Sequence, residues 1–177
     1  MYKVLSGLIL LVASSVWGPA VASAVQLLDQ EGHPLFLAGP AQRLASHAVS
    51  MTTLILLLGG QQQLVATSSE VKANPWLGQI FPSLATIATP FNGGTGNVDM
   101  ETLLAKKPDL VVIWTGNSAL RQQLTRLGIP SLTLGYSTPA ELTAAIRLLA
   151  NAMGPEARQI AANYLDYYQG NIALLQR

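Results

Sequence analysis

The segment from Val98 to Trp114 constrains the fold of this chain more than any other part of the sequence. Asp99 stands where a helix N-cap belongs, because its carboxylate can accept the free amide hydrogens of a first helical turn. The helix that follows ends at a Lys-Pro-Asp turn, residues 107–109, since proline disfavours continuation of a helix. Leu110 to Trp114 is then continuously apolar, as a strand covered on both faces should be. The segment therefore predicts a helix, a turn and a buried parallel strand.

Short apolar runs alternate with helical patterns on both sides of this segment. We expect further strands at residues 43–46, 64–67 and 129–134, and helices at 51–58, 120–127, 139–149 and from Glu156 to the end. Residues 82–97, which contain two prolines and a glycine-rich run, are expected to be irregular. Strands that alternate with helices imply a parallel sheet with right-handed crossovers. The predicted fold class is α/β, a three-layer sandwich around a mostly parallel sheet.

The N-terminal residues have the composition of an export signal. Lys3 gives a positive start, residues 5–16 are apolar with interruptions only by small residues, and Ala22-Ser23-Ala24 offers a cleavage site. We therefore expect residues 1–24 to be a signal peptide, cleaved near Ala24, and the mature chain to be periplasmic. A buried helix or a membrane anchor is the alternative, but the run is short for a span of about 20 residues. The sequence contains no cysteine, so the exported fold must hold without disulfides.

Two short apolar runs between Val25 and Leu37 flank the turn-rich sequence Asp29-Gln30-Glu31-Gly32, which predicts a β-hairpin. This hairpin and the motifs after it resemble, in order and spacing, the N-terminal lobe of type III periplasmic substrate-binding proteins. These proteins serve ABC importers of iron siderophores, haem and cobalamin. The further matching motifs are Arg43-Leu44, Leu58-Gly59, the helix start at 99–103, Lys-Pro-Asp-Leu-Val at 107–111 and Leu-Gly-Ile at 127–129.

The resemblance implies one Rossmann-like lobe over residues 25–154 and the start of an interlobe helix at 155–177, with the second lobe absent from this sequence. It also implies a non-enzymatic clamp that binds a metal chelate and delivers it to a membrane permease. By position, Glu101 matches the glutamate with which such a lobe docks on its permease. A first-turn acid favoured by the helix dipole is the plainer interpretation. The truncated sequence leaves three explanations open: an incomplete gene product, a second lobe on a separate chain, or a lobe that associates with itself.

Ligands of open α/β sheets bind outside the carboxyl ends of the strands. This rule selects four loops, and from them we predict the ligand-binding residues His47, Ser50, Trp76, Asn97, Trp114 and Asn117. The resemblance implies that Trp114 packs against the corrin in cobalamin-binding relatives, although a core aromatic fits that position equally well. Trp76 could form an apolar wall or pack a helix. His47 could ligate iron or be a hydrogen-bonded loop residue, and we predict no metal site and no cofactor.

The charge pattern limits the partners of the chain. Its formal net charge is +1 and it has no basic run, so we predict no nucleic-acid binding. Near the selected loops the only cations are Lys72 and Arg121, which favours a neutral, bulky or aromatic-faced ligand over an anionic siderophore. The hairpin, in contrast, is more typical of iron-chelate members, so the choice among chelates stays open. No common catalytic motif is present, and we predict no enzyme. The alternative function is a docking or sensory lobe that binds no ligand by itself.

Overall fold

The structure is a computed structural model that describes residues 24–93 and 97–175. The predicted signal peptide lies outside the described residues, except for Ala24. The strands are β1 (Val25–Leu28), β2 (Pro34–Leu37), β3 (Leu44–Ser46), β4 (Leu64–Ser68), β5 (Ala88–Phe91), β6 (Leu110–Trp114) and β7 (Ser131–Leu134). The α-helices are α1 (Val49–Leu57), α2 (Ser69–Ala73), α3 (Pro75–Ile80), α4 (Met100–Ala105), α5 (Ser118–Arg126), α6 (Pro139–Met153) and α7 (Pro155–Leu175). Two 3₁₀ turns are η1 (Gly60–Gln62) and η2 (Pro82–Thr86).

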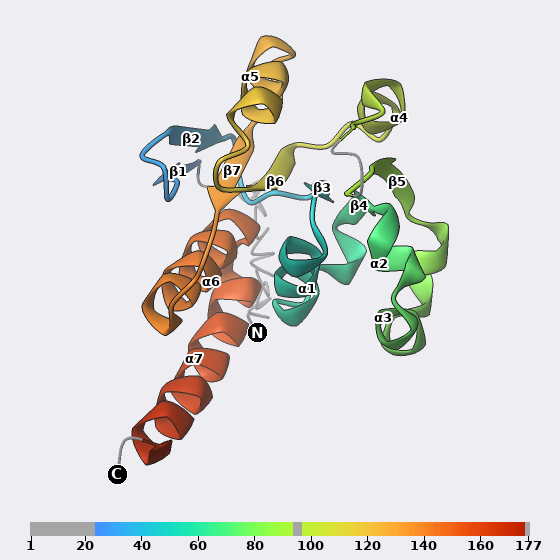
Figure 1. Cartoon of the computed structure of the whole chain (residues 1–177). Coiled ribbons are helices and arrows are strands. Elements are labelled where there is room, and N and C mark those ends of the chain that lie inside the picture. The colour runs from blue at the N-terminus through green and yellow to red at the C-terminus, as the bar shows by residue number, and fades with distance from the viewer. Residues whose placement is uncertain (1–23, 94–96, 176–177) are drawn as a thin grey trace, which may run out of the picture.

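The main sheet has five strands in the order β5-β4-β3-β6-β7, and every neighbouring pair is parallel. The chain starts this sheet at its central strand, builds outward to β5, and then returns to build the other half from β6. The strand order therefore reverses at β3, and the carboxyl ends of β3 and β6 lie on either side of the reversal. Antiparallel β1 and β2 form the predicted N-terminal hairpin beside β7 (Figure 1).

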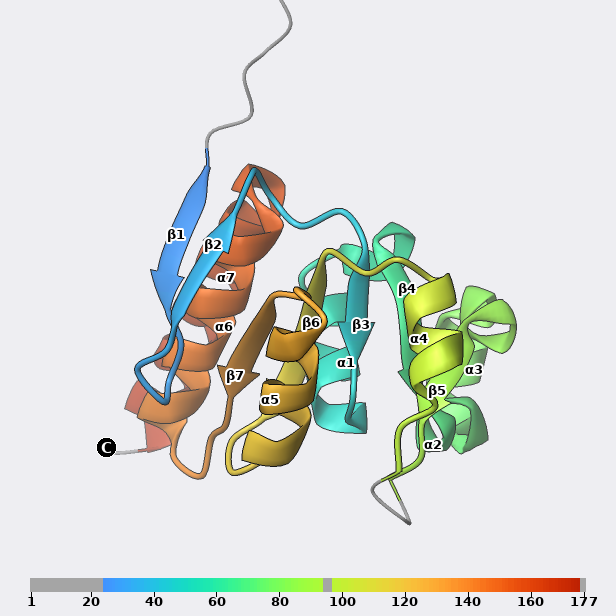
Figure 2. The same cartoon turned by 90° about the horizontal axis from the view of Figure 1, so that it is seen from above.

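Helices cover both faces of the sheet, as the predicted α/β sandwich requires (Figure 2). Along β6 the side chains alternate between two cores. Leu110 and Val112 join a core with α1, α6 and α7, whereas Val111 and Ile113 join a core with α4 and α5. This alternation follows from the two-residue period of a strand. Because both sets are buried, every residue of β6 is apolar, and not only every second one.

The predicted local signals are confirmed where helices begin. The Asp99 carboxylate accepts a hydrogen bond from the Thr102 amide at 3.0 Å and caps α4. Thr138 and Glu141 form the expected capping box at the start of α6. The last helix, α7, buries Ala157, Ala161 and Leu165 against α6 and runs to Leu175. No helix within residues 24–93 and 97–175 is long and apolar enough to cross a bilayer.

One expectation is wrong. Residues 82–97 are not irregular throughout, because Ala88 to Phe91 forms β5 and pairs with β4. Pro90 argues against a strand since it has no amide hydrogen to donate to a ladder. However, β5 is an edge strand, and one of its sides has no neighbour in the five-stranded sheet. A proline is tolerated at such an edge.

Candidate functional site

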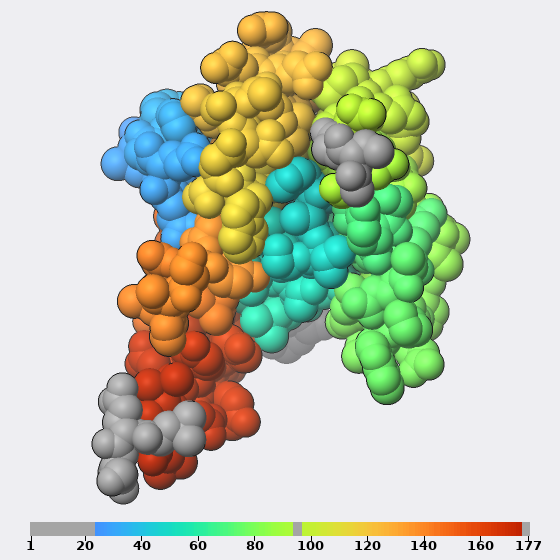
Figure 3. Space-filling view, in the orientation of Figure 1, coloured from blue at the N-terminus to red at the C-terminus, as the bar shows by residue number. Residues whose placement is uncertain are grey.

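The carboxyl ends of the five parallel strands open on one face of the molecule, which Figure 3 shows directly. The teal segment that joins β3 to α1 lies at the centre of this face. The yellow segment after β6 and the green segment around α2 lie on either side of it. The reversal of strand order at β3 creates space between neighbouring loops, and such a point is the usual binding position in open α/β sheets.

A hollow of about 590 Å³ lies at this position. It is lined by residues at or just after the carboxyl ends of β3, β4, β5 and β6 and in the first turns of α1 and α2: His47, Ala48, Val49, Ser50, Ser68, Glu70, Gly93 and Trp114. Of the residues predicted from the sequence, His47, Ser50 and Trp114 line the hollow, and Asn117 contacts His47 from behind. The structure thus brings four of the six predicted residues together. Their role in ligand binding stays a prediction.

His47 is held in place from both sides of its ring. Its Nδ1 atom accepts a hydrogen bond from the backbone amide of Trp114 at 3.3 Å, and its Nε2 atom lies 3.2 Å from the Asn117 side-chain amide. The ring edge packs against Phe91, with 6.2 Å between ring centroids and an angle of 87° between planes. These contacts tie the ends of β3, β5 and β6 together through one imidazole.

The contacts with Trp114 and Asn117 also favour the neutral form of His47, because both neighbours present N–H groups to the ring. A backbone amide can only donate, so Nδ1 accepts the bond from Trp114 and carries no proton. In the neutral ring the proton is then on Nε2, and the contact with the Asn117 amide nitrogen is a close approach of two donors rather than a hydrogen bond. Burial lowers the pKa of His47 below its ordinary value and thereby favours the same neutral form. Ligation of a metal by Nε2 would require Asn117 to move away. The site therefore uses His47 first as a hydrogen-bonding residue.

An aromatic pair forms one wall beside the hollow. The rings of Trp114 and Tyr136 meet edge to face, with 5.2 Å between centroids. Burial raises the pKa of the Tyr136 hydroxyl, and a side-chain hydrogen bond with Ser50 opposes that rise. The phenol therefore stays neutral at physiological pH. Tyr136 was not among the predicted residues, although it follows β7 just as Trp114 ends β6, so the strand-end rule could have found it.

The opposite wall is polar and carries an acid. The Glu70 carboxylate packs so closely against Gly93 that a Cβ atom on residue 93 would lie 2.8 Å from it. A larger residue at position 93 would displace the Glu70 carboxylate. Close to Glu70 in the sequence, Ser68 is only 1% exposed, and its hydroxyl has no hydrogen-bond partner among the described residues. A donor that is buried without a partner at the wall of a hollow can serve a ligand carrying an acceptor atom.

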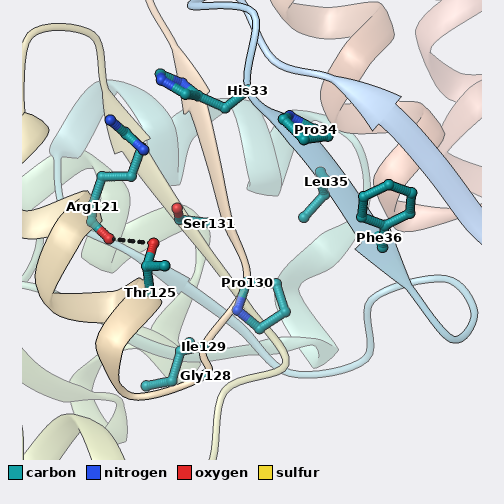
Figure 4. A pocket seen from close by; sticks show the side chains of 10 residues that line it. All are labelled: His33, Pro34, Leu35, Phe36, Arg121, Thr125, Gly128, Ile129, Pro130 and Ser131. Atoms are coloured by element: carbon teal, nitrogen blue, oxygen red, sulfur yellow. Dashed lines mark hydrogen bonds between the residues drawn. The ribbon is translucent and has the colours of Figure 1, made fainter.

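Neither cation that the sequence places near the site lines the hollow. Lys72 is exposed on α2. Arg121 lines a separate groove of about 370 Å³ between the hairpin and α5 (Figure 4). Among the described residues that line the hollow, Glu70 is the one charged side chain, since the His47 imidazole is neutral. The electrostatics of the hollow therefore disfavour an anionic ligand.

Trp76 and Asn97 do not line the hollow. Trp76 is 72% exposed on α3, while Asn97 is exposed in the loop that ends at the Phe91–Val98 bridge. Glu101 is exposed on α4, which covers the opposite face of the sheet from α1. Their predicted roles stay predictions. Within residues 24–93 and 97–175, no group of three or more metal-ligating side chains comes together.

Comparison with known proteins places this architecture in a family. The family model described as periplasmic binding protein matches residues 44–169, which include the whole five-stranded sheet. The chain belongs to the periplasmic binding protein family. This is a family of binding proteins rather than enzymes, and the resemblance predicted from the sequence is confirmed.

Curated relatives match part of the chain. It is 42% identical over 76 residues to the vitamin B12-binding protein of Salmonella typhi, an overlap of 40% of this chain and 28% of that protein. The match to the vitamin B12-binding protein of Salmonella typhimurium is 40% over 76 residues, with the same coverage.

Solved structures share the fold at lower identity. A periplasmic solute binding protein from Veillonella parvula superposes with a TM-score of 0.77 at 21% identity, over 87% of this chain and 47% of that one. The molybdate periplasmic binding protein of Haemophilus influenzae gives a TM-score of 0.75 at 19% identity, over 85% and 52%. The periplasmic vitamin B12 binding protein of Vibrio cholerae gives 0.60 at 24%, over 74% and 49%. The chain thus spans about half the length of these solved proteins.

Proposed function

We propose that this chain is the ligand-binding lobe of an ABC import system for a metal chelate, with cobalamin the preferred ligand and an iron chelate the second choice. The observation that carries this proposal is the aromatic wall of Trp114 and Tyr136 beside a hollow that is lined by no lysine or arginine of residues 24–93 and 97–175. We further propose that the chain works in the periplasm after cleavage near Ala24, and that it delivers its ligand to a membrane permease without catalysing a reaction.

The chemistry of the walls favours a broad neutral ligand. Flat aromatic rings offer a large apolar contact to a planar or corrugated macrocycle. On the other wall, the buried Ser68 hydroxyl can donate to a carbonyl of the ligand. Glu70 repels carboxylate-rich and oxyanion ligands but can accept hydrogen bonds from amide groups. A corrin with neutral amide side chains meets all these conditions, and an anionic siderophore does not.

The comparisons support the same choice without deciding it. The curated proteins that match carry the name vitamin B12-binding protein. The solved relatives bind more varied ligands, since one holds molybdate and another holds ferric iron with two molecules of acinetobactin. The fold therefore accommodates many ligands, and the side chains of the hollow must select among them.

A thermal-shift titration tests the proposal. The purified chain is heated with cobalamin, haem, a ferric hydroxamate or a ferric catecholate, because a ligand that binds the folded state raises Tm by mass action. We expect a saturable rise with cobalamin that disappears in Trp114→Ala. Tyr167→Ala is the matched control, since Tyr167 is 71% exposed on α7, away from the hollow. The control should keep the response of the unsubstituted chain.

The outcomes separate the two candidate functions. If cobalamin binds saturably and Trp114→Ala and Tyr167→Ala weaken the binding equally, the hollow is not the binding site. A folded chain that responds to none of the ligands would contradict ligand binding by this lobe alone. That result would favour the docking or sensory lobe, for which the exposed Glu101 on α4 is the available contact.

A further inference from the structure

The turn of the N-terminal hairpin is unusually well fixed for a surface loop. The Asp29 carboxylate is only 6% exposed and accepts hydrogen bonds from the amides of Glu31 and His33 at 2.9 and 2.7 Å. Burial raises the pKa of Asp29, but the hydrogen bonds from the His33 and Glu31 amides outweigh burial, so the pKa lies below its ordinary value. Gly32 completes the turn with φ of +81°. The turn is therefore a preformed, rigid unit.

Two side chains of this turn reach away from the hairpin to separate loops at the carboxyl edge of the sheet. The Glu31 carboxylate accepts a hydrogen bond from the Gly116 amide at 2.7 Å. The Gln30 side-chain oxygen accepts one from the Gly135 amide, also at 2.7 Å, and its nitrogen donates to the Glu141 carbonyl at 3.3 Å. The Gln30 amide itself donates to the Thr133 carbonyl, which docks the turn beside β7. In Figure 3 the blue surface of the hairpin adjoins the yellow segment after β6.

These two loops carry the aromatic wall. Gly116 lies two residues after Trp114, and Gly135 immediately precedes Tyr136. The loops also pack on each other, because a Cβ atom on Gly135 would collide with the Thr115 side chain. The Thr115 amide donates to the Leu134 carbonyl at 2.9 Å. A displacement of either loop would therefore change the edge-to-face contact of the two rings.

We propose that Gln30 and Glu31 are positioning residues that hold the Trp114–Tyr136 wall in its binding geometry, although neither residue lines the hollow. We call the two hydrogen bonds from Gln30 and Glu31 to the loops the brace. The effect of the brace on ligand binding rests on the proposed function, whereas the existence of the brace does not. Glu31 contributes the stronger bond, because hydrogen bonds to a carboxylate exceed those between neutral groups. The two bonds join residues that are 85 and 105 positions apart in the sequence. They therefore fix the two loops to the hairpin, in addition to the attachment of each loop to the main sheet.

The structural arm of the test needs no ligand. Amide hydrogen exchange of Gly116 and Gly135 is measured by NMR in the full chain and in Glu31→Ala, Gln30→Ala and the double variant. We expect exchange of the bonded amide to accelerate roughly tenfold or more, as loss of a hydrogen bond to a charged group implies. The near-ultraviolet circular dichroism of the Trp114–Tyr136 pair should weaken. Glu31→Gln keeps an acceptor oxygen and should restore most of the protection.

Gln26→Ala is the matched control, since Gln26 is an exposed glutamine on β1 of the same hairpin. It should leave both amides and the spectrum unchanged. If Glu31→Ala and Gln30→Ala also leave them unchanged, the brace does not exist. A loss of protection that Glu31→Gln fails to restore would show general damage to the hairpin and would equally overturn the proposal.

The ligand arm uses cobalamin as the probe. We expect Kd to rise roughly tenfold in Glu31→Ala, to recover in Glu31→Gln and to stay the same in Gln26→Ala. Loosened loops with an unchanged Kd would overturn the positioning role. If the unsubstituted chain binds no cobalamin while the exchange results appear as expected, the proposed function fails and the brace stands.

Discussion

His47 shows how much one residue organises at the candidate site. Its ring contacts the Trp114 amide, the Asn117 side chain and the Phe91 ring, which come from the end of β6, the loop after β6 and the end of β5. The hydrogen bond from the Trp114 amide requires an imidazole whose Nδ1 carries no proton. A proton added at Nδ1 would face the Trp114 amide hydrogen and break that bond. The local order of the hollow is therefore linked to the protonation of one side chain.

This linkage predicts a pH dependence of stability. The pKa of His47 in the folded chain lies below the value of 6.5 that an exposed histidine has. Well above pH 6.5, neither the folded nor the unfolded state binds this proton, and the contribution of His47 to stability is complete. As the pH falls below 6.5, the unfolded state binds the proton first, so the free energy of unfolding decreases until the pH passes the folded pKa. Urea unfolding between pH 7.5 and 5 measures the decrease.

His47→Gln removes the titrating group but keeps an oxygen that can accept from the Trp114 amide. We expect the decrease between pH 7.5 and 5 to become smaller in this variant. His33→Gln is the matched control, because it replaces the histidine of the hairpin turn and leaves the contribution of His47 in place. An identical pH profile for the unsubstituted chain and His47→Gln would contradict the linkage.

The sequence predicts some of these residues and misses others for identifiable reasons. His47 and Trp114 stand at the ends of recognisable apolar strands, so the strand-end rule finds them. Glu70 lines the hollow from α2, a helix that was not predicted, and it packs on Gly93, which follows the unpredicted strand β5. The orphan hydroxyl of Ser68 depends on burial, which no local pattern of the sequence records. Local spacing thus identifies positions along the chain, whereas contacts between loops require the three-dimensional fold.

At the scale of elements, the Lys-Pro-Asp turn has a structural role that its sequence did not reveal. The Asp109 carboxylate accepts hydrogen bonds from the backbone amides of Gln42 and Arg43, at 2.8 and 2.9 Å. The Arg43 side chain in turn donates to the carbonyls of Lys106 and Lys107. These bonds connect the start of β3 to the turn before β6. The strands whose far ends carry His47 and Trp114 are therefore aligned from their near ends.

We expect Asp109→Ala to destabilise the fold without changing the hollow. The loss of two bonds to a partly exposed carboxylate should cost about 1–2 kcal/mol. For a chain of this size the cost corresponds to a fall in Tm of roughly 2–8 °C. Asp166→Ala is the control, because Asp166 is an exposed acid on α7. Equal Tm values for the two variants would show that the carboxylate of Asp109 does not align the strands.

At the scale of the whole molecule, the hollow and Glu101 lie in different regions. The hollow opens at the carboxyl edge of the sheet, while α4 covers the face opposite α1 and contributes no residue to the lining. A lobe with this arrangement can contact a membrane partner through α4 while its ligand occupies the strand ends. We propose that the docking surface and the ligand site of this lobe are separate. The proposal concerns the lobe and not a complete importer component, because the chain spans about half the length of its solved relatives.

The division predicts that docking and ligand binding respond to different substitutions. Glu101→Lys reverses an exposed charge in the first turn of α4. If this acid pairs with a permease arginine, the reversal replaces attraction with repulsion and should weaken association with a reconstituted cobalamin permease roughly tenfold or more. The Kd for cobalamin should not change.

Glu156→Lys is the matched control, since Glu156 is an exposed acid in the first turn of α7. Equal loss of association in both variants would indicate an effect of net charge alone. If Glu101→Lys instead binds the permease with unchanged affinity, Glu101 only stabilises its own helix through the helix dipole.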